Sequence, residues 1–255
     1  MMILVFAWAL AMAVPMTASA DHSWGGYHWA RTSNPFTVKL GDNVTSAWDP
    51  YLVTTSRDWT TPFVVGATDV LDAPIVRGGS RSVKLCDATA GQVQVCNFKY
   101  GDTGWLGVAS IWASGKHITR ATVKLNDTYF NTPSYNTPAW RNLVSCQEVG
   151  HTLGLHHQDE AFDNANLGTC MDYTGSPDDN QHPNQHDYDQ LALIYEHLDA
   201  TSTLASTTAA TAPAPVSADA AWGRLVRETN GGRGAWFLRD LGAGNVILTH
   251  VFWAR

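Results

Sequence analysis

The run CQEVGHTLGLHHQD constrains this chain more than any other part of its sequence. Gln147 and His151 are four residues apart, so on a helix their side chains project from one face, and Glu148 lies beside them. Gly154 permits the left-handed turn that ends a helix, after which His157 can return to the same face. An amide, a carboxylate and two imidazoles are therefore expected to line one cleft wall.

This set of side chains predicts a zinc site with Gln147, His151 and His157 as ligands, because catalytic zinc keeps three protein ligands and one open position. Glutamine Oε1 lies as many bonds from Cβ as histidine Nε2, so the amide oxygen can reach a metal without moving the helix. It is a weaker donor to zinc than an imidazole, and its NH2 group needs a separate acceptor. Two nearby histidines, His156 and His197, are expected to be solvated.

The spacing E-x-x-H-x-x-G-x-x-H, followed by TCMDY at residues 169–173, resembles the metzincin clan of zinc endopeptidases. The resemblance covers about residues 27–198, and it departs from the metzincin motif at Gln147, where metzincins have histidine. It implies that Met171 lies in a turn beneath the metal. It also implies that Tyr173 corresponds to the tyrosine that approaches zinc in the astacin-like and serralysin-like branches.

The activity that this resemblance implies is that of a secreted zinc-dependent endopeptidase. Zinc would lower the pKa of a bound water, Glu148 would be the general base, and Tyr173 would stabilise the oxyanion. The strand GVASIWA, residues 107–113, would pair with an extended peptide, as the corresponding strand does in metzincins. The alternative is a non-catalytic extracellular binding module on the same scaffold, in which Gln147 marks lost or weakened metal binding.

The element pattern predicts an α+β fold, and the resemblance implies that this fold is zincin-like or metzincin-like. Its twisted sheet is expected to be mixed but mostly antiparallel, with an active-site helix and a C-terminal closing helix. Strand patterns occur in FTVKL (36–40), RSVKL (81–85), QVQVCNF (92–98), GVASIWA and ITRATVKLN (118–126). Helices are expected at about 47–58, 140–153 and 183–198.

The chain is expected to divide into four parts. Residues 1–20 are apolar and end in Ala-Ser-Ala, which predicts a signal peptide, with a retained membrane anchor as the alternative. Residues 21–200 form the catalytic domain. Residues 201–220, rich in Ala, Thr, Ser and Pro, have linker composition. Residues 221–255 form a small β-rich segment that is too short to fold securely alone.

Four cysteines in an exported chain favour two disulfides, for which three connectivities exist. Local pairing is the preferred interpretation. Cys86–Cys96 would close a short turn-like segment, and Cys146–Cys170 would join the helix that carries the histidines to the methionine segment. A zinc ion held by all four cysteines is the alternative, but it lacks the close C-x-x-C spacing.

The formal net charge of −7 argues against a nucleic-acid partner, because lysines and arginines form no run that would offset it. After the first 20 residues no stretch is long and apolar enough to cross a bilayer. The expected protein is therefore a secreted monomer. Its expected partner is an extended peptide or protein substrate.

Overall fold

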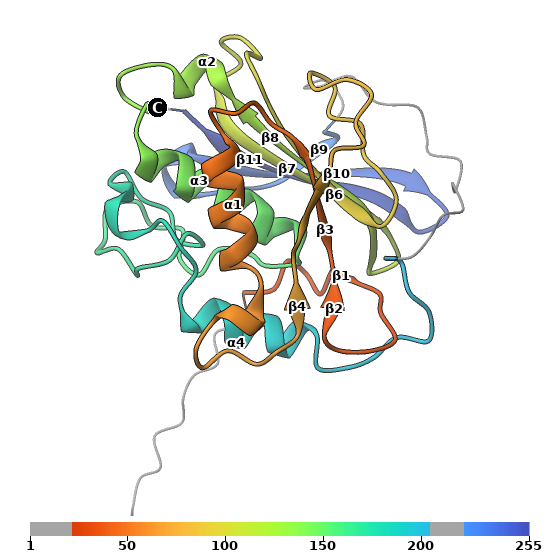
Figure 1. Cartoon of the computed structure of the whole chain (residues 1–255). Helices are drawn as coiled ribbons and strands as arrows, with labels where there is room; N and C mark the ends of the chain where they lie inside the picture. Colours follow the sequence, from red (N-terminus) through yellow and green to blue (C-terminus); the bar gives the residue numbers. More distant parts are fainter. Residues whose placement is uncertain (1–21, 205–221, 255) are drawn as a thin grey trace, which may run out of the picture.

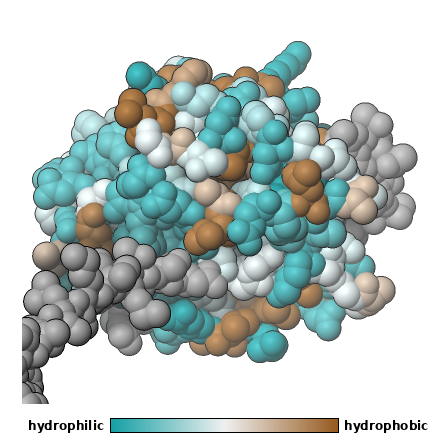
Figure 2. Space-filling model, turned by 90° about the horizontal axis from the view of Figure 1, so that it is seen from below, coloured by the Kyte–Doolittle hydropathy of each residue, from teal (hydrophilic) through white to brown (hydrophobic). Residues whose placement is uncertain are grey.

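The computed structural model describes residues 22–204 and 222–254. The predicted signal peptide and residues 205–220 of the predicted linker lie outside the described residues. Within the described residues, no helix is long and apolar enough to cross a membrane. The face of the molecule seen from below is largely hydrophilic, with hydrophobic residues in scattered patches (Figure 2).

A mixed sheet of nine strands forms the framework of an α+β fold (Figure 1). The strands are His28–Trp29 (β1), Lys39–Asn43 (β3), Ile75–Arg77 (β5), Gln92–Phe98 (β6), Trp105–Ser114 (β7), His117–Asn126 (β8), Arg224–Glu228 (β9), Gly234–Gly242 (β10) and Asn245–Trp253 (β11). Their order is β5-β3-β6-β8-β7-β11-β10-β9, and β1 pairs with β8 off this path. Two short strands, Phe36–Thr37 (β2) and Leu71–Asp72 (β4), form a separate pair.

The prediction of a mostly antiparallel sheet is wrong for one half of it. β3 pairs in parallel with β5 and β6, and β6 pairs in parallel with β8. Antiparallel pairing runs from β8 through β7, β11 and β10 to β9. Short turns between strand patterns suggested hairpins, but β8 lies between β6 and β7 in the sheet, so strands that follow each other in sequence are not always neighbours.

The segment RSVKL, residues 81–85, forms no strand, contrary to the prediction. It belongs to a turn that leads into Cys86, whose positive φ of 53° breaks the extended chain and whose sulfur bonds to Cys96. The second disulfide joins Cys146 to Cys170. The structure thus contains both cysteine pairs that local pairing predicts.

In residues 22–204 and 222–254, four α-helices accompany the sheet. They are Asp49–Asp58 (α1), Asp127–Phe130 (α2), Pro138–Thr152 (α3) and Gln185–Ile194 (α4). In α3 the proline occupies the first turn, where no backbone donor is lost, and the Thr137 hydroxyl accepts a hydrogen bond from Trp140 N. α1 and α3 lie side by side and pack against the sheet (Figure 1).

A glycine in the sheet brings α3 close to β7. A Cβ atom added at Gly107 would lie 2.6 Å from Val144 Cγ1 and 2.8 Å from Glu148 Cγ, both on α3. Close packing of this kind is what places the carboxylate of Glu148 against the strand. α4 ends at Ile194, before the predicted end at residue 198, and Leu198 is exposed, whereas Leu191 and Ile194 of α4 are buried.

The C-terminal segment extends the main sheet and is not separate from it. β11 pairs with β7 over nine residues, from Asn245 opposite Ser114 to Trp253 opposite Trp105. β10 and β9 follow as the last two strands at this end of the sheet. Strand β7, expected to present a free edge, is therefore flanked by β8 and β11.

Candidate metal centre

α3 carries the first three residues of the candidate site. Gln147, Glu148 and His151 lie in its second half, and each has no exposed surface. The disulfide between Cys146 and Cys170 fixes this part of the helix to the segment that contains Met171. The predicted helix and the predicted placement of these three side chains on it agree with the structure.

The chain after α3 turns back at Gly154, whose φ is 97°. A Cβ atom there would lie 2.3 Å from Tyr27 O, so both the conformation and the close backbone contact require glycine. Trp24 N donates to Gly154 O at 2.6 Å. His157 returns to α3 after this turn, and its Nε2 lies 3.1 Å from Nε2 of His151.

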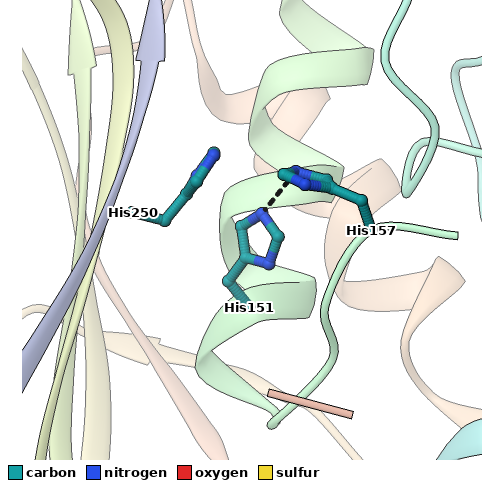
Figure 3. A group of neighbouring side chains, drawn as sticks. All are labelled: His151, His157 and His250. Atoms are coloured by element: carbon teal, nitrogen blue, oxygen red, sulfur yellow. Dashed lines mark hydrogen bonds between the residues drawn. The ribbon is translucent and has the colours of Figure 1, made fainter. Parts of the chain in front are cut away.

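The two imidazoles face each other in a way that fits a cation between them (Figure 3). His151 Nδ1 lies 2.9 Å from Leu155 O, and a carbonyl only accepts, so the ring proton is on Nδ1. His157 Nδ1 lies 3.5 Å from a Glu160 carboxylate oxygen. Because the Nδ1 atom of each neutral ring donates its proton to an acceptor, the Nε2 atoms of His151 and His157 both carry lone pairs, and these point toward each other. Tetrahedral zinc, with bonds of about 2.0–2.1 Å, separates its ligand atoms by about 3.3 Å.

Electrostatics keeps both rings in the form that a metal needs. Burial lowers the pKa of His151 and the pKa of His157 well below the usual value, and neighbouring imidazoles lower them further. A neutral imidazole retains the lone pair with which it binds a metal. The chemistry of this donor pair therefore fits zinc.

The side-chain amide of Gln147 is held at its NH2 end. Its Nε2 donates to Cys170 O at 2.7 Å. Its Oε1 is buried and has no hydrogen-bond partner among the described residues. The NH2 group thus has the separate acceptor that the sequence analysis required, and the amide oxygen is left with an unmet need for a cation or a donor.

His250 in β11 is a site residue that the sequence analysis missed. One of its ring nitrogens lies within 4.8 Å of ligand atoms of His151 and His157, and Figure 3 shows the ring directed from the sheet toward them. Its Nδ1 lies 3.1 Å from Glu148 Oε2, and its Nε2 lies 2.7 Å from the Tyr173 hydroxyl. The available signal was a single histidine within the apolar strand pattern NVILTHVFW.

Glu148 and Tyr173 are both buried at the site. Burial raises the pKa of Glu148, and the neighbouring His250 acts in the opposite direction. Burial also raises the pKa of Tyr173 well above its usual value, and the Glu148 charge adds to that effect, so the phenol keeps its proton. Glu148 Oε1 has no hydrogen-bond partner among the described residues. A carboxylate that can accept a proton thus lies close to a phenol that can donate a hydrogen bond.

Met171 is buried against α3. A Cβ atom added at Gly150 would lie 2.6 Å from Met171 Sδ, so this glycine permits the contact. Met171 O accepts from Gln158 N at 2.6 Å, next to His157 in sequence. His156, expected at the surface, is instead largely covered by Trp236 of β10, whose ring stacks on it at 4.2 Å.

No family model and no curated protein matched this sequence.

Proposed function

We propose that this chain is a secreted zinc-dependent endopeptidase of the metzincin type, in a closed form. Zinc would be held by His151 and His157, with Gln147 Oε1 as a weaker third donor. The observation that carries the proposal is the approach of Nε2 of His151 and Nε2 of His157 to 3.1 Å, with a buried amide oxygen on α3 that has no hydrogen-bond partner in the described part of the chain. Two disulfides support an extracellular location.

The chemistry follows from the residues around this pair. Zinc, when bound, would lower the pKa of a bound water toward neutrality and polarise a peptide carbonyl. Glu148 would take the proton of the attacking water on a carboxylate oxygen and deliver it to the leaving amine. Burial raises the pKa of Glu148, which brings it closer to the working pH of a general base. The Tyr173 hydroxyl would donate a hydrogen bond to the developing oxyanion.

The hairpin of β10 and β11 has to leave β7 before a peptide can pair with that strand. β11 fills the edge along which an extended substrate would align, and the hydroxyls of Ser110 and Thr249 lie 3.0 Å apart across it. His250 on the same strand is within hydrogen-bond distance of both the Glu148 carboxylate and the Tyr173 hydroxyl. Release of one segment would therefore free the substrate edge, the base and the phenol together.

A non-catalytic extracellular binding module is the second candidate. The observation that favours it is the pairing of β11 with β7 over nine residues, which leaves no edge of β7 for a peptide. In that case the centre would serve stability, with His250 as a permanent member of the donor set.

Metal content and cleavage, measured on the same preparations, test the proposal. Zinc-loaded protein should hydrolyse unfolded casein, and a chelator should stop it. Glu148→Gln should abolish cleavage and leave zinc bound, because the proposed base is not a ligand. Gln147→His should tighten zinc binding, since imidazole is the better donor. His182→Ala, which removes a half-exposed ring that bonds Asp58, is the matched control and should change neither.

Two outcomes would decide against an enzyme. Zinc-replete protein that cleaves nothing, even after His250→Ala, would favour the binding module. Cleavage that survives Glu148→Gln would show that the base is assigned wrongly.

A further inference from the structure

A second group of histidines gathers around Asp199, outside the candidate metal centre. His28 in β1, His117 at the start of β8 and Asp199 after α4 each offer a ligand atom within 4.8 Å of the others. His197 adds a fourth donor, because its Nε2 lies 3.2 Å from His28 Nε2. The four residues come from three parts of the chain that are far apart in sequence.

Four of the six distances between these donor atoms lie near the edge of a tetrahedron, but His197 falls outside the group whose atoms all lie within 4.8 Å of one another. Asp199 Oδ1 lies 3.2 Å from Nε2 of His117, 3.4 Å from Nε2 of His28 and 3.8 Å from Nε2 of His197. Tetrahedral zinc with bonds of about 2.0–2.1 Å places its ligand atoms about 3.3 Å apart. To bind one zinc ion together with the other three, the half-exposed ring of His197 would have to turn toward His117.

Hydrogen bonds outside the group turn the donor atoms inward. His28 Nδ1 lies 2.9 Å from Gly26 O, and this carbonyl only accepts, so Nδ1 carries a proton, and a neutral ring would present its Nε2 lone pair to the group. Asp199 Oδ2 accepts from Arg31 Nη1 at 2.9 Å and from Arg31 N at 3.2 Å. Oδ1 is thereby left for the imidazoles. Built metal sites orient their ligands in this manner.

We propose that His28, His117, His197 and Asp199 bind a zinc ion with a structural role. Four protein ligands leave no open position for water, as in structural zinc sites. The competing interpretation is a set of protonated imidazoles around a carboxylate. That interpretation allows a proton between the rings on only one of them, because Nε2 of His28 and Nε2 of His197, only 3.2 Å apart, cannot both direct protons at each other. Zinc titration distinguishes the two interpretations.

The proposed ion would join β1 to the start of β8 and to the chain after α4, close to the C-terminal end of α3. Asp199 N donates to Arg31 O at 2.9 Å, so the chain after α4 already runs beside the segment that follows β1. In Figure 1, α4 lies at the bottom, and the chain that leaves it passes the first strands. Trp29 Nε1 in turn donates to Thr152 O at 2.9 Å, at the last residue of α3. The ion would thus support the turn that brings His157 into place.

Zinc titration of the purified, chelator-stripped protein tests the proposal. His151→Ala combined with His157→Ala should still bind one zinc per chain. His117→Ala combined with His197→Ala should lower the affinity of that site more than about 100-fold, because losing even a group that only orients a ligand costs about 10–100-fold. These two side chains are 42% and 49% exposed, so the core should remain intact.

A second readout is heat stability. Zinc should raise the unfolding midpoint of the wild-type protein and of His182→Ala, the exposed-histidine control, more than that of the His117/His197 variant. Unchanged zinc affinity in the His117/His197 variant would overturn the proposal, as would a folded His151/His157 variant that binds no zinc. A wild-type protein with one zinc, lost only with His117 and His197, would support this site and count against the centre at α3.

Discussion

Replacement of His250 by alanine should raise the rate of peptide hydrolysis while lowering the stability of the closed form. The imidazole lies 3.1 Å from a Glu148 carboxylate oxygen and 2.7 Å from the Tyr173 hydroxyl. All three side chains are buried. Alanine at position 250 therefore leaves a carboxylate and a phenol in the closed form without these partners.

The size of the effect follows from those two contacts. Glu148 keeps a hydrogen bond to the Ala109 backbone and Tyr173 keeps one to Thr229, so the loss is that of two hydrogen bonds. A hydrogen bond to a charged group contributes about 1.5–3 kcal/mol and a neutral one about 0.5–1.5 kcal/mol, so the closed form is destabilised by about 2–4.5 kcal/mol. In the open form both groups reach water, and the whole difference favours opening. Since about 1.4 kcal/mol corresponds to a tenfold change in an equilibrium constant, even the lower limit raises the open fraction about 30-fold.

The assay is the initial rate of cleavage of unfolded, fluorescently labelled casein at saturating zinc, with urea unfolding measured in parallel. We expect His250→Ala to cleave at least about tenfold faster than wild type and to unfold at lower urea concentration. Adding Glu148→Gln to His250→Ala should remove the gain. A lower rate at saturating zinc would refute the reasoning, because His250 would then be a ligand that cleavage needs.

Three further changes test other parts of the fold. Replacing Cys146 and Cys170 together by serine should lower the free energy of unfolding by about 3 kcal/mol; urea midpoints equal to wild type would contradict this. Gly154→Ala should destabilise by at least about 1–2 kcal/mol, because φ is 97° and the new Cβ meets a backbone oxygen. Gly175→Ala, with nothing within 4 Å of the new atom, should be close to neutral in the same urea measurement. Burial raises the pKa of Asp187 from 3.8 to about 6, so its contribution to stability is present below 3.8 and is lost as pH rises through 6. As pH rises from 3.8 to about 6, the free energy of unfolding of Asp187→Asn should therefore increase relative to that of wild type, as measured by urea unfolding. A difference between the two proteins that stays constant with pH would argue against the pKa shift.

The sequence determined the local part of the site well. Helical spacing places Gln147, Glu148 and His151 together whatever the rest of the fold does, and Gly154 supplies the turn for His157. These are contacts over at most ten residues, where periodicity and backbone preferences are strong. The predicted pairing of Cys146 with Cys170 also placed the segment before Met171 next to α3, because a disulfide requires the two cysteines to be in contact.

The missing parts depend on long-range pairing. His250 reaches Glu148 only because β11 joins β7, and the contact spans 102 residues of sequence. Strand patterns indicate that a segment is extended, but they do not say which neighbour it takes. The group around Asp199 could not be predicted for the same reason, because its members lie in β1, at the start of β8 and after α4. His197, judged by its own surroundings in the sequence, had no neighbour that marked it as a donor.

Gln147 and His250 belong to one arrangement. The amide oxygen on α3 is a weak donor, while the imidazole on β11 is a strong one. One nitrogen of this imidazole lies within 4.8 Å of ligand atoms of the same two histidines, but it would have to leave Glu148 or Tyr173 to bind a metal. If zinc binds more tightly when β11 is in place, then zinc must favour the closed hairpin by the same factor, because coupling between two equilibria is reciprocal. A histidine at position 147 would make the α3 donors sufficient alone and would weaken that coupling. Under the proposed function, the glutamine at 147 would suit a site whose metal affinity depends on the position of the C-terminal strand β11.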